Sequence, residues 1–191
     1  MARSYTLKRR AQSQAETKLR IVEAAVELHG SVGPAATTVS MIAEKAGVQR
    51  HTVYAHFPDD RSLLLACSGL AIERSPLPNA EPCCAIPDSA ARLRCGLGEL
   101  YRWYAANAEL AGSVLRDAET HALTREVNAL RWGPPMASYH EVLGSGMNPK
   151  QRALLHLALG FPAWRALVRE SGLSHEEAVD AMVKTVLCCA G

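Results

Sequence analysis

Residues 38–57 read TVSMIAEKAGVQRHTVYAHF, a pattern that predicts two short helices joined by a glycine turn. Thr38 is a good N-cap for the first helix, and Gly47 can adopt the left-handed conformation that ends it. In the second helix, Val53 and Phe57 are spaced so that both can face the body of the domain. We therefore expect a helix-turn-helix.

The second predicted helix begins near Gln49 and directs polar side chains outward. This outward set comprises Arg50, His51, Thr52, Tyr54 and His56. The forked guanidinium of Arg50 can bind guanine O6 and N7, a contact worth about 1–3 kcal/mol of discrimination, whereas hydroxyl groups mainly position a protein on phosphates. The pattern indicates a DNA-binding helix-turn-helix with Arg50 as its specificity residue. The alternative is a purely structural pair of helices.

The chain has 191 residues, of which 48% are apolar, and it holds only three Trp and two Phe. That length permits one large domain or two small ones, and the composition favours an all-α protein. Residues 75–87 carry four prolines and predict a loop. Apolar spacing predicts helices over 15–31, 59–70, 88–107, 108–123, 124–143 with a break at Gly133-Pro134-Pro135, 149–169 and 174–189.

Positive charge is concentrated at the amino-terminal end. Residues 1–62 hold nine Lys/Arg and six Asp/Glu, whereas residues 63–191 hold 12 and 13. The first twenty residues alone hold six basic groups and one acidic group, Glu16. We expect residues 1–11 to form a flexible basic arm, either simply solvated or in contact with the DNA backbone.

Several classes of protein are excluded by the pattern. The chain shows neither a secretory signal nor an apolar run of the ~20 residues that a membrane span needs, so we expect a cytoplasmic protein without membrane contact. Nucleophile elbow, phosphate loop and metal-ligand spacing are also missing, which predicts no catalytic residue, metal or cofactor. The six cysteines follow no secreted framework and are expected to be free thiols, including the adjacent pairs Cys83-Cys84 and Cys188-Cys189.

The last two predicted helices, within residues 150–189, are apolar around most of their circumference. Leu155, Leu157 and Trp164 illustrate this in one helix, and Val179 and Val183 do so in the other. A chain of this size has difficulty covering two such helices. We expect them to pack against a symmetric copy as a four-helix bundle, making the protein a homodimer.

The segment from Thr38 to Leu65, with Arg20-Ile21-Val22-Glu23-Ala24-Ala25 before it, resembles the DNA-binding domain of TetR/AcrR-type transcriptional regulators. The matching pattern is Thr-x-x-x-Ile-Ala-x-x-Ala-Gly-Val from Thr38, then Thr-Val-Tyr-x-His-Phe from Thr52, then paired leucines. The resemblance implies a three-helix DNA-binding domain over residues 1–58. A connecting helix would join it to a helical ligand-binding and dimerisation domain over residues 59–191.

The resemblance also implies roles for individual residues. Each helix-turn-helix of a homodimer would enter the major groove at one half of a palindromic operator. Thr38, Tyr54 and His56 would contact phosphates, and Ser40, Arg50, His51 and Thr52 would approach base edges.

Two positions depart from the family pattern. Gln49 stands where many members have a capping Ser or Thr, and Asp60 stands where many have a phosphate-binding lysine. The neighbouring Arg61 is a candidate to replace that lysine.

The implied function is a ligand-responsive regulator that a small-molecule effector releases from its operator. We expect repression, with activation as the alternative. Candidate effector-binding residues are Leu97, Leu100, Tyr101, Tyr104, His121, Trp132, Met136 and Tyr139, any of which could instead be core. Two other functions remain open: a response through the thiols of Cys83 and Cys84, and a small-molecule binder or enzyme with a vestigial helix-turn-helix.

Overall fold

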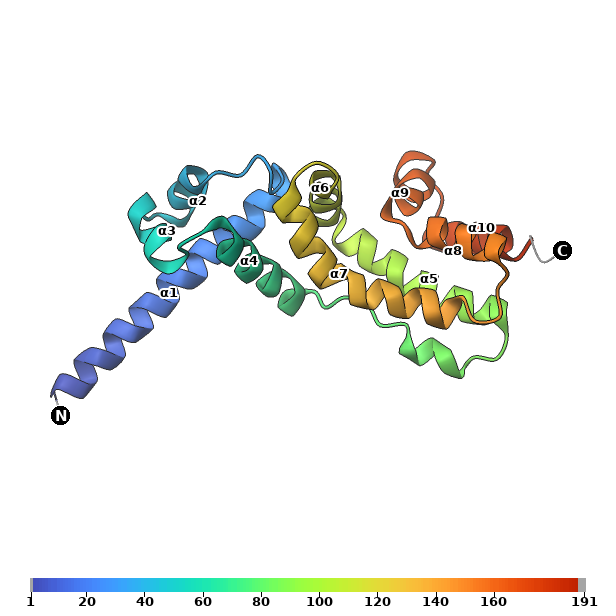
Figure 1. The fold of residues 1–191 in the computed structure, drawn as a ribbon, viewed down its shortest axis with the longest axis horizontal. Coiled ribbons are helices and arrows are strands. Elements are labelled where there is room, and N and C mark those ends of the chain that lie inside the picture. The colour runs from blue at the N-terminus through green and yellow to red at the C-terminus, as the bar shows by residue number, and fades with distance from the viewer. Residues whose placement is uncertain (1, 189–191) are drawn as a thin grey trace. The chain divides into compact units, whose positions relative to one another are not determined.

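The computed structural model describes residues 2–188, with side chains described from residue 8 onward, and this part of the chain is helical with connecting turns and loops (Figure 1). The predicted all-α fold is confirmed. None of the described helices combines the length and apolar character that a membrane span requires.

The chain forms two compact units. The N-terminal unit comprises the residues up to 76 together with 112–128, and the C-terminal unit comprises 77–111 together with the residues from 129 onward. Helices α6 (Ala108–Ala118) and α7 (Ala122–Leu143) therefore each contribute residues to both units. The predicted functional boundary at residues 58 and 59 stays a prediction.

Four helices make up most of the N-terminal unit, and α1 packs against the other three. They are α1 (Ala2–Ser31), α2 (Val39–Ala46), α3 (Arg50–His56) and α4 (Asp60–Arg74). Their shared core contains Ile21, Val22, Ala24, Ala25, Ile42, Ala43, Ala46, Val53, Phe57, Leu63, Leu64 and Cys67, with Val127 of α7. The predicted connecting helix is α4, and the Asp59 carboxylate caps it by accepting a hydrogen bond from the Ser62 amide at 2.7 Å.

The flexible basic arm predicted for residues 1–11 is wrong over the described residues. Helix α1 begins at Ala2, whereas we expected it to begin near Ala15. The segment contains no Pro or Gly before Gly30 and is rich in Lys, Arg, Gln and Ala, which are good helix formers. The first part of α1 therefore extends a helix that the core already holds.

The C-terminal unit is built around α5 (Ser89–Ala106), which packs against α10 and also contacts α8 and α9. Its other elements are the 3₁₀ helix η1 (Glu81–Ala85), α8 (Pro149–Leu159), α9 (Phe161–Trp164), the π-helix η2 (Arg165–Glu170) and α10 (His175–Cys188). The proline-rich segment predicted as a loop thus contains η1, with Pro82 in its first turn. Cys189 lies outside the described residues.

The single helix predicted over residues 149–169 is wrong, because the chain breaks after Leu159. Pro162 has no amide hydrogen to donate to the carbonyl of Ala158, so the helical ladder cannot continue there. The Tyr101 hydroxyl donates instead to the Ala158 carbonyl at 2.9 Å, and the Tyr104 hydroxyl donates to the Leu159 carbonyl at 2.7 Å. Two hydroxyls from α5 thus satisfy buried carbonyls at the end of α8.

Two other predicted helix boundaries also differ. Helix α6 ends at Ala118 and α7 begins at Ala122, where one helix was expected to reach residue 123. The predicted break at Gly133-Pro134-Pro135 is wrong, since α7 runs through it. Gly133, Pro134 and the preceding Leu130 are exposed, so water can bind carbonyls that lose their helical donors.

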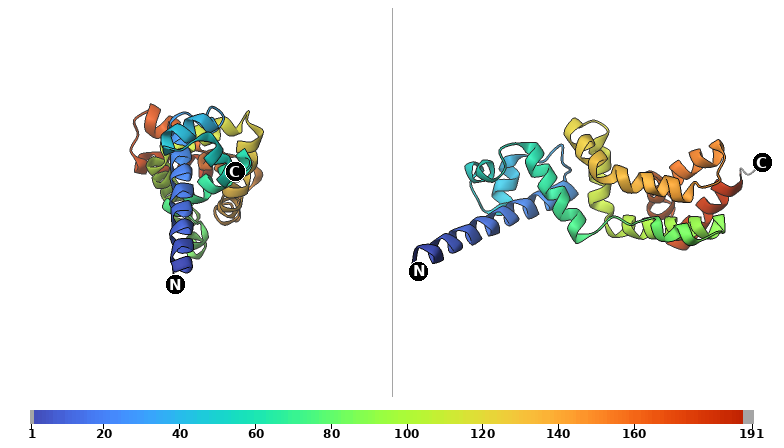
Figure 2. Two further views of the ribbon diagram at one scale, coloured as in Figure 1. Left: turned by 90° about the vertical axis from the view of Figure 1, so that its left-hand side faces the viewer. Right: turned by 60° about the horizontal axis from the view of Figure 1, so that its bottom comes forward.

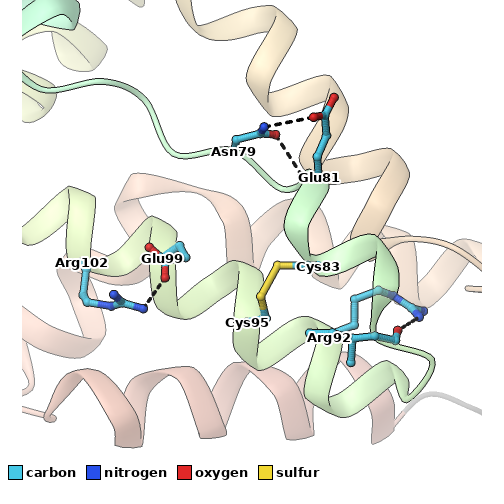
Figure 3. The surroundings of a disulfide bond; sticks show 8 residues. Asn79, Glu81, Cys83, Arg92, Cys95, Glu99 and Arg102 are labelled. Atoms are coloured by element: carbon cyan, nitrogen blue, oxygen red, sulfur yellow. Dashed lines mark hydrogen bonds and ion pairs between the residues drawn. A yellow bond between two sulfur atoms is a disulfide. The ribbon is translucent and has the colours of Figure 1, made fainter.

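The expectation that all cysteines are free is wrong for two of them. Cys83 of η1 and Cys95 of α5 form a disulfide with their Cα atoms 6.1 Å apart (Figure 3). The Asn79 side chain accepts a hydrogen bond from the Glu81 amide at 3.0 Å and fixes the start of η1. The chain reversal after η1 brings together cysteines twelve positions apart, a contact that their sequence spacing alone did not show.

Burial of His29 gives the N-terminal unit a predicted pH dependence. Its Nδ1 lies 3.4 Å from Cys67 Sγ, and burial lowers its pKa to about 4, although the Asp117 carboxylate partly opposes that shift. The unfolded chain protonates this imidazole near pH 6.5. Between those values the unfolded state binds more protons, so the free energy of unfolding falls as pH falls.

We expect the free energy of unfolding to drop by about 2 kcal/mol between pH 7 and pH 5 through His29 alone. Urea unfolding of the wild type and His29→Gln at both pH values measures this, because every other titrating group is common to the two proteins. Equal pH dependence in both proteins would contradict the assignment.

Candidate DNA-binding site

The first helix of the helix-turn-helix has defined caps at both ends. The Thr38 hydroxyl accepts a hydrogen bond from the Met41 amide at 3.3 Å. Gly47 has φ +65°, and its amide and that of Val48 donate to the carbonyls of Glu44 and Ala43. Only glycine adopts this left-handed conformation with little steric strain, so the local sequence fixes where α2 ends.

Helix α3 is held by packing and not by a side-chain cap. Gln49 occupies its N-cap position without a side-chain capping hydrogen bond, which matches the departure seen in the sequence. Val53 and Phe57 are buried, with 1% and 4% of their surface exposed. The Lys18 ammonium lies 5.4 Å from the centroid of the Phe57 ring, so α1 covers this anchor.

The predicted DNA-contact residues all lie on α3 or at the start of α2, within the N-terminal unit. Arg50, His51 and Tyr54 on α3 and Thr38 and Ser40 at the start of α2 are exposed. Thr52 and His56 on α3 are half-buried. Thr38, Ser40, Arg50 and Tyr54 also line a common cavity of about 360 Å³, whereas His51, Thr52 and His56 do not.

The two charged positions after α3 behave differently from the family pattern. Asp60 lines the same cavity as Arg50 and Tyr54, where its carboxylate would repel a phosphate. The Arg61 guanidinium donates to Glu126 Oε1 at 2.8 Å. Both partners are about half exposed, so the pair is weak, but it directs Arg61 toward α7.

The loop before α2 is fixed by α6. The Asp117 carboxylate, only 7% exposed as a residue, accepts a hydrogen bond from the Ala35 amide at 2.9 Å. The Ser113 hydroxyl donates to the Gly30 carbonyl at 3.0 Å. Gly33 has φ +94°, and a Cβ there would lie 2.3 Å from Asp117 Oδ2, so only glycine allows this close approach. We call these contacts the α6 clamp.

Sequence comparison identifies this surface. Residues 21–67 match the family model of bacterial regulatory proteins of the tetR family. Residues 21–67 form a TetR-family DNA-binding domain. The protein is therefore a DNA-binding transcriptional regulator, and the prediction that it is not an enzyme agrees with that domain's family, which is non-enzymatic.

Solved structures of regulators share the fold of the chain at low sequence identity. The Bacillus subtilis regulator FadR is 17% identical with a TM-score of 0.60, covering 88% of this chain and 96% of its own. Salmonella enterica GusR is 17% identical with a TM-score of 0.60, covering 91% and 96%. A transcriptional regulator from Rhodococcus is 17% identical with a TM-score of 0.60, and the match covers 90% of this chain and 96% of the Rhodococcus protein. No curated protein sequence matches the chain.

Seven of the eight candidate effector residues of this TetR-family protein lie in the C-terminal unit. Leu97, Leu100, Tyr101, Tyr104 and Tyr139 are buried, and Trp132 and Met136 are half-buried. The eighth, His121, lies in the N-terminal unit, where its Nδ1 is 2.7 Å from the Thr124 hydroxyl. His121 belongs to the turn that starts α7 and thus to a different unit from the other seven.

Aromatic rings cluster around the candidate effector residues. The Tyr104 ring lies 6.0 Å from Trp132, 5.2 Å from Phe161 and 5.8 Å from Trp164. The Tyr139 hydroxyl and the Trp164 Nε1 are both buried without a hydrogen-bond partner. Burial also raises the pKa of Tyr139 to about 12, so its hydroxyl stays a neutral donor. The His175 ring centroid lies 6.5 Å from the Trp164 ring, and its Nδ1 is likewise buried without a hydrogen-bond partner.

The sequence interpretation missed the α6 clamp and the unsatisfied Trp164. Gly33 gave a turn signal, but nothing near Asp117 in the sequence indicates a contact some eighty residues away. Trp164 was assigned to a dimer-forming helix because the chain break after Leu159 was not expected.

Proposed function

We propose that the protein is a ligand-responsive repressor that binds a palindromic operator as a homodimer and is released by a small-molecule effector. The observation that supports this most directly is the exposed polar surface of α3, held on a helix whose opposite side is buried through Val53 and Phe57. Such a helix can enter a major groove without losing its packing.

Contacts within the operator follow from chemistry and exposure. Arg50, the one basic side chain at the start of α3, would bind a guanine edge, with Ser40, His51 and Thr52 near neighbouring bases. Thr38, Tyr54 and His56 would position the protein on phosphates. Because Asp60 replaces a basic contact and Arg61 pairs with Glu126, we do not assign a phosphate contact to either.

We expect Arg50→Ala to reduce affinity for the operator roughly 10- to 100-fold while changing affinity for unrelated DNA little, because a guanine contact carries sequence information. Tyr54→Phe is expected to weaken binding to both DNAs by a similar factor, since it removes a positioning hydroxyl. Mobility shifts with the promoter DNA of the neighbouring genes measure both. No shift by the wild type at low salt would contradict the proposed function, and equal losses on both DNAs would remove Arg50 as the specificity residue.

The effector would bind in the C-terminal unit beside the aromatic cluster. A ligand with a largely apolar body and a hydrogen-bonding group could satisfy the Tyr139 hydroxyl or Trp164 Nε1. Each of these groups destabilises the folded protein while it is buried without a hydrogen-bond partner. FadR, which shares this fold, has been solved with stearoyl-CoA, so the fold can hold a ligand with a long apolar part. Native mass spectrometry of the purified protein would detect a retained effector, and an effector that leaves operator affinity unchanged at saturation would contradict release.

The α6 clamp suggests how such release works. Helix α6 supplies residues to both units, and its Asp117 and Ser113 hold the loop that leads into Thr38. A shift of α6 on effector binding would therefore move the start of α2 together with the helix-turn-helix. The connecting helix α4 lies within the N-terminal unit and would follow the same movement.

Dimer formation is proposed through residues 150–189, of which Cys189 lies outside the described part. Within the described residues, Leu157 on α8 is 53% exposed, and Leu154, Ala181 and Met182 are half-buried. Leu155 and Val183 pack inside the protomer. The exposed apolar residues of α8 and α10 are what a symmetric copy would cover.

We expect Leu157→Glu to raise the dimer dissociation constant at least tenfold, because the two-fold axis would bury two unpaired carboxylates. Operator affinity should fall with it. Sedimentation equilibrium measures the assembly, and Leu130→Glu is the matched control, since Leu130 is similarly exposed at 56% but lies outside the proposed interface. An unchanged dimer in Leu157→Glu would rule out this interface.

A second candidate function is a redox response, which the Cys83–Cys95 disulfide favours. The bond ties η1 to α5, the helix that carries Leu97, Tyr101 and Tyr104, and the neighbouring Cys84 is exposed. Disulfides in compartments that keep thiols reduced are usually redox-sensing. A small dithiol would cleave the bond, giving thiols on Cys83 and Cys95 and oxidising itself to a disulfide.

If this response exists, a dithiol should change operator affinity of the wild type at least fivefold, and Cys95→Ser should show the reduced behaviour under all conditions. Cys188→Ser is the control, because it removes an exposed thiol and leaves the disulfide intact. Identical operator binding by oxidised and reduced wild type would contradict the redox function.

A further inference from the structure

We infer that the amino-terminal half of α1 is a second DNA-contact surface, which binds the sugar-phosphate backbone of the duplex flanking each operator half-site. This inference rests on the proposed binding of an operator.

The first half of α1 does not pack against the N-terminal unit. Every described residue from Lys8 to Glu16 is exposed, and the core of the unit begins at Ile21. In Figure 1 and in the right-hand view of Figure 2, this half of α1 extends away from α2, α3 and α4. Between Lys8 and Glu16, the surface of α1 is therefore accessible to solvent or to a ligand.

The composition of this half points to a polyanion. Among the first twenty residues, six are basic and only Glu16 is acidic. Residues 8–18 read KRRAQSQAETK and contain no large apolar side chain. A coiled-coil partner or a membrane surface would require an apolar stripe, which this sequence does not provide.

Cations elsewhere in the N-terminal unit are largely engaged in holding the fold. Lys18 lies over the Phe57 ring, and Arg20 donates to the Ala46 carbonyl at the end of α2 at 3.3 Å. The unit also contains ion pairs of Lys45 with Glu27, Arg61 with Glu126, Arg74 with Glu23, and Arg116 with Asp117. Non-specific attraction to DNA comes mainly from Lys and Arg near phosphates, so the exposed Lys8 and Arg10 form a substantial part of that supply.

The reach of α1 fits a contact outside the groove that α3 enters. The segment from Ala2 to Arg20 spans about 28 Å at about 1.5 Å per residue, more than the roughly 12 Å width of a major groove. It is continuous with the packed half of α1, so helix nucleation has already occurred there. A preformed helix also loses less conformational entropy on binding than a disordered arm.

The experiment compares two duplexes, one trimmed to the operator and one with about ten additional base pairs at each end. The variant Lys8→Gln/Arg10→Gln removes two exposed cations from this surface. Arg94→Gln/Arg102→Gln is the control, because it removes two exposed cations from α5 in the C-terminal unit, outside the proposed dimer interface. On the long duplex we expect the first variant to bind at least tenfold more weakly at low salt. The slope of log affinity against log salt should fall by about 2 to 4 for a dimer, at about 0.9 per phosphate contact.

On the trimmed duplex the same variant should bind within about twofold of the wild type, and the control variant should match the wild type on both duplexes. Equal losses on the two duplexes, an equal loss in the control variant, or no loss on the long duplex would each overturn this inference and leave operator binding intact. Failure of the wild type to bind either duplex would overturn the proposed function and this inference together.

Discussion

The N-terminal unit depends on the burial of Val53 and Phe57 against α1. Helix α3 has seven residues and no side-chain cap, and an isolated helix of that length is unstable in water. Burying a large apolar side chain contributes about 1.5–3 kcal/mol, so these two contacts can supply what the local sequence does not. They also set the rotation of α3 and thereby decide that Arg50 and Tyr54 face outward. The side chains that stabilise α3 and those proposed to contact DNA therefore lie on opposite faces of this two-turn helix.

In the C-terminal unit, polar atoms fix the architecture as much as apolar packing does. Pro162 ends the hydrogen-bond ladder of α8, and the hydroxyls of Tyr101 and Tyr104 satisfy the carbonyls that this leaves at Ala158 and Leu159. Leaving such buried groups unpaired would cost about 1–3 kcal/mol each, which explains why α5 and α8 meet in this register. Four buried side-chain atoms depart from that rule within the described residues: the Tyr139 hydroxyl, Trp164 Nε1, His175 Nδ1 and Arg92 Nε. The Tyr139 hydroxyl and Trp164 Nε1 are the donors with which the proposed effector would form hydrogen bonds.

The sequence predicted those parts of the structure whose causes are local. Thr38 and Gly47 mark the ends of α2 through caps, and the apolar spacing of Val53 and Phe57 marks the inner face of α3. It failed where the decisive contact is distant, as for Cys83 with Cys95 and for Asp117 with Ala35. The presence of a proline also did not predict by itself where a helix ends. Pro134 is accommodated inside a helix on an exposed face, whereas Pro162 ends one beside buried tyrosines. Only the surroundings of each proline distinguish these outcomes.

Charge connects the departures from the family pattern to the length of α1. Asp60 places a carboxylate where phosphate attraction is expected, and Arg61 pairs with Glu126. Lys18 and Arg20 are used to cover Phe57 and to cap α2, so the three-helix body gains stability from cations that other arrangements would offer to DNA. In the proposed operator complex, positive charge would come from the exposed basic half of α1, which is continuous with the part of the helix that anchors α3. One half of α1 therefore stabilises the helix-turn-helix, and the other half would attract DNA phosphates beyond the groove that α3 enters.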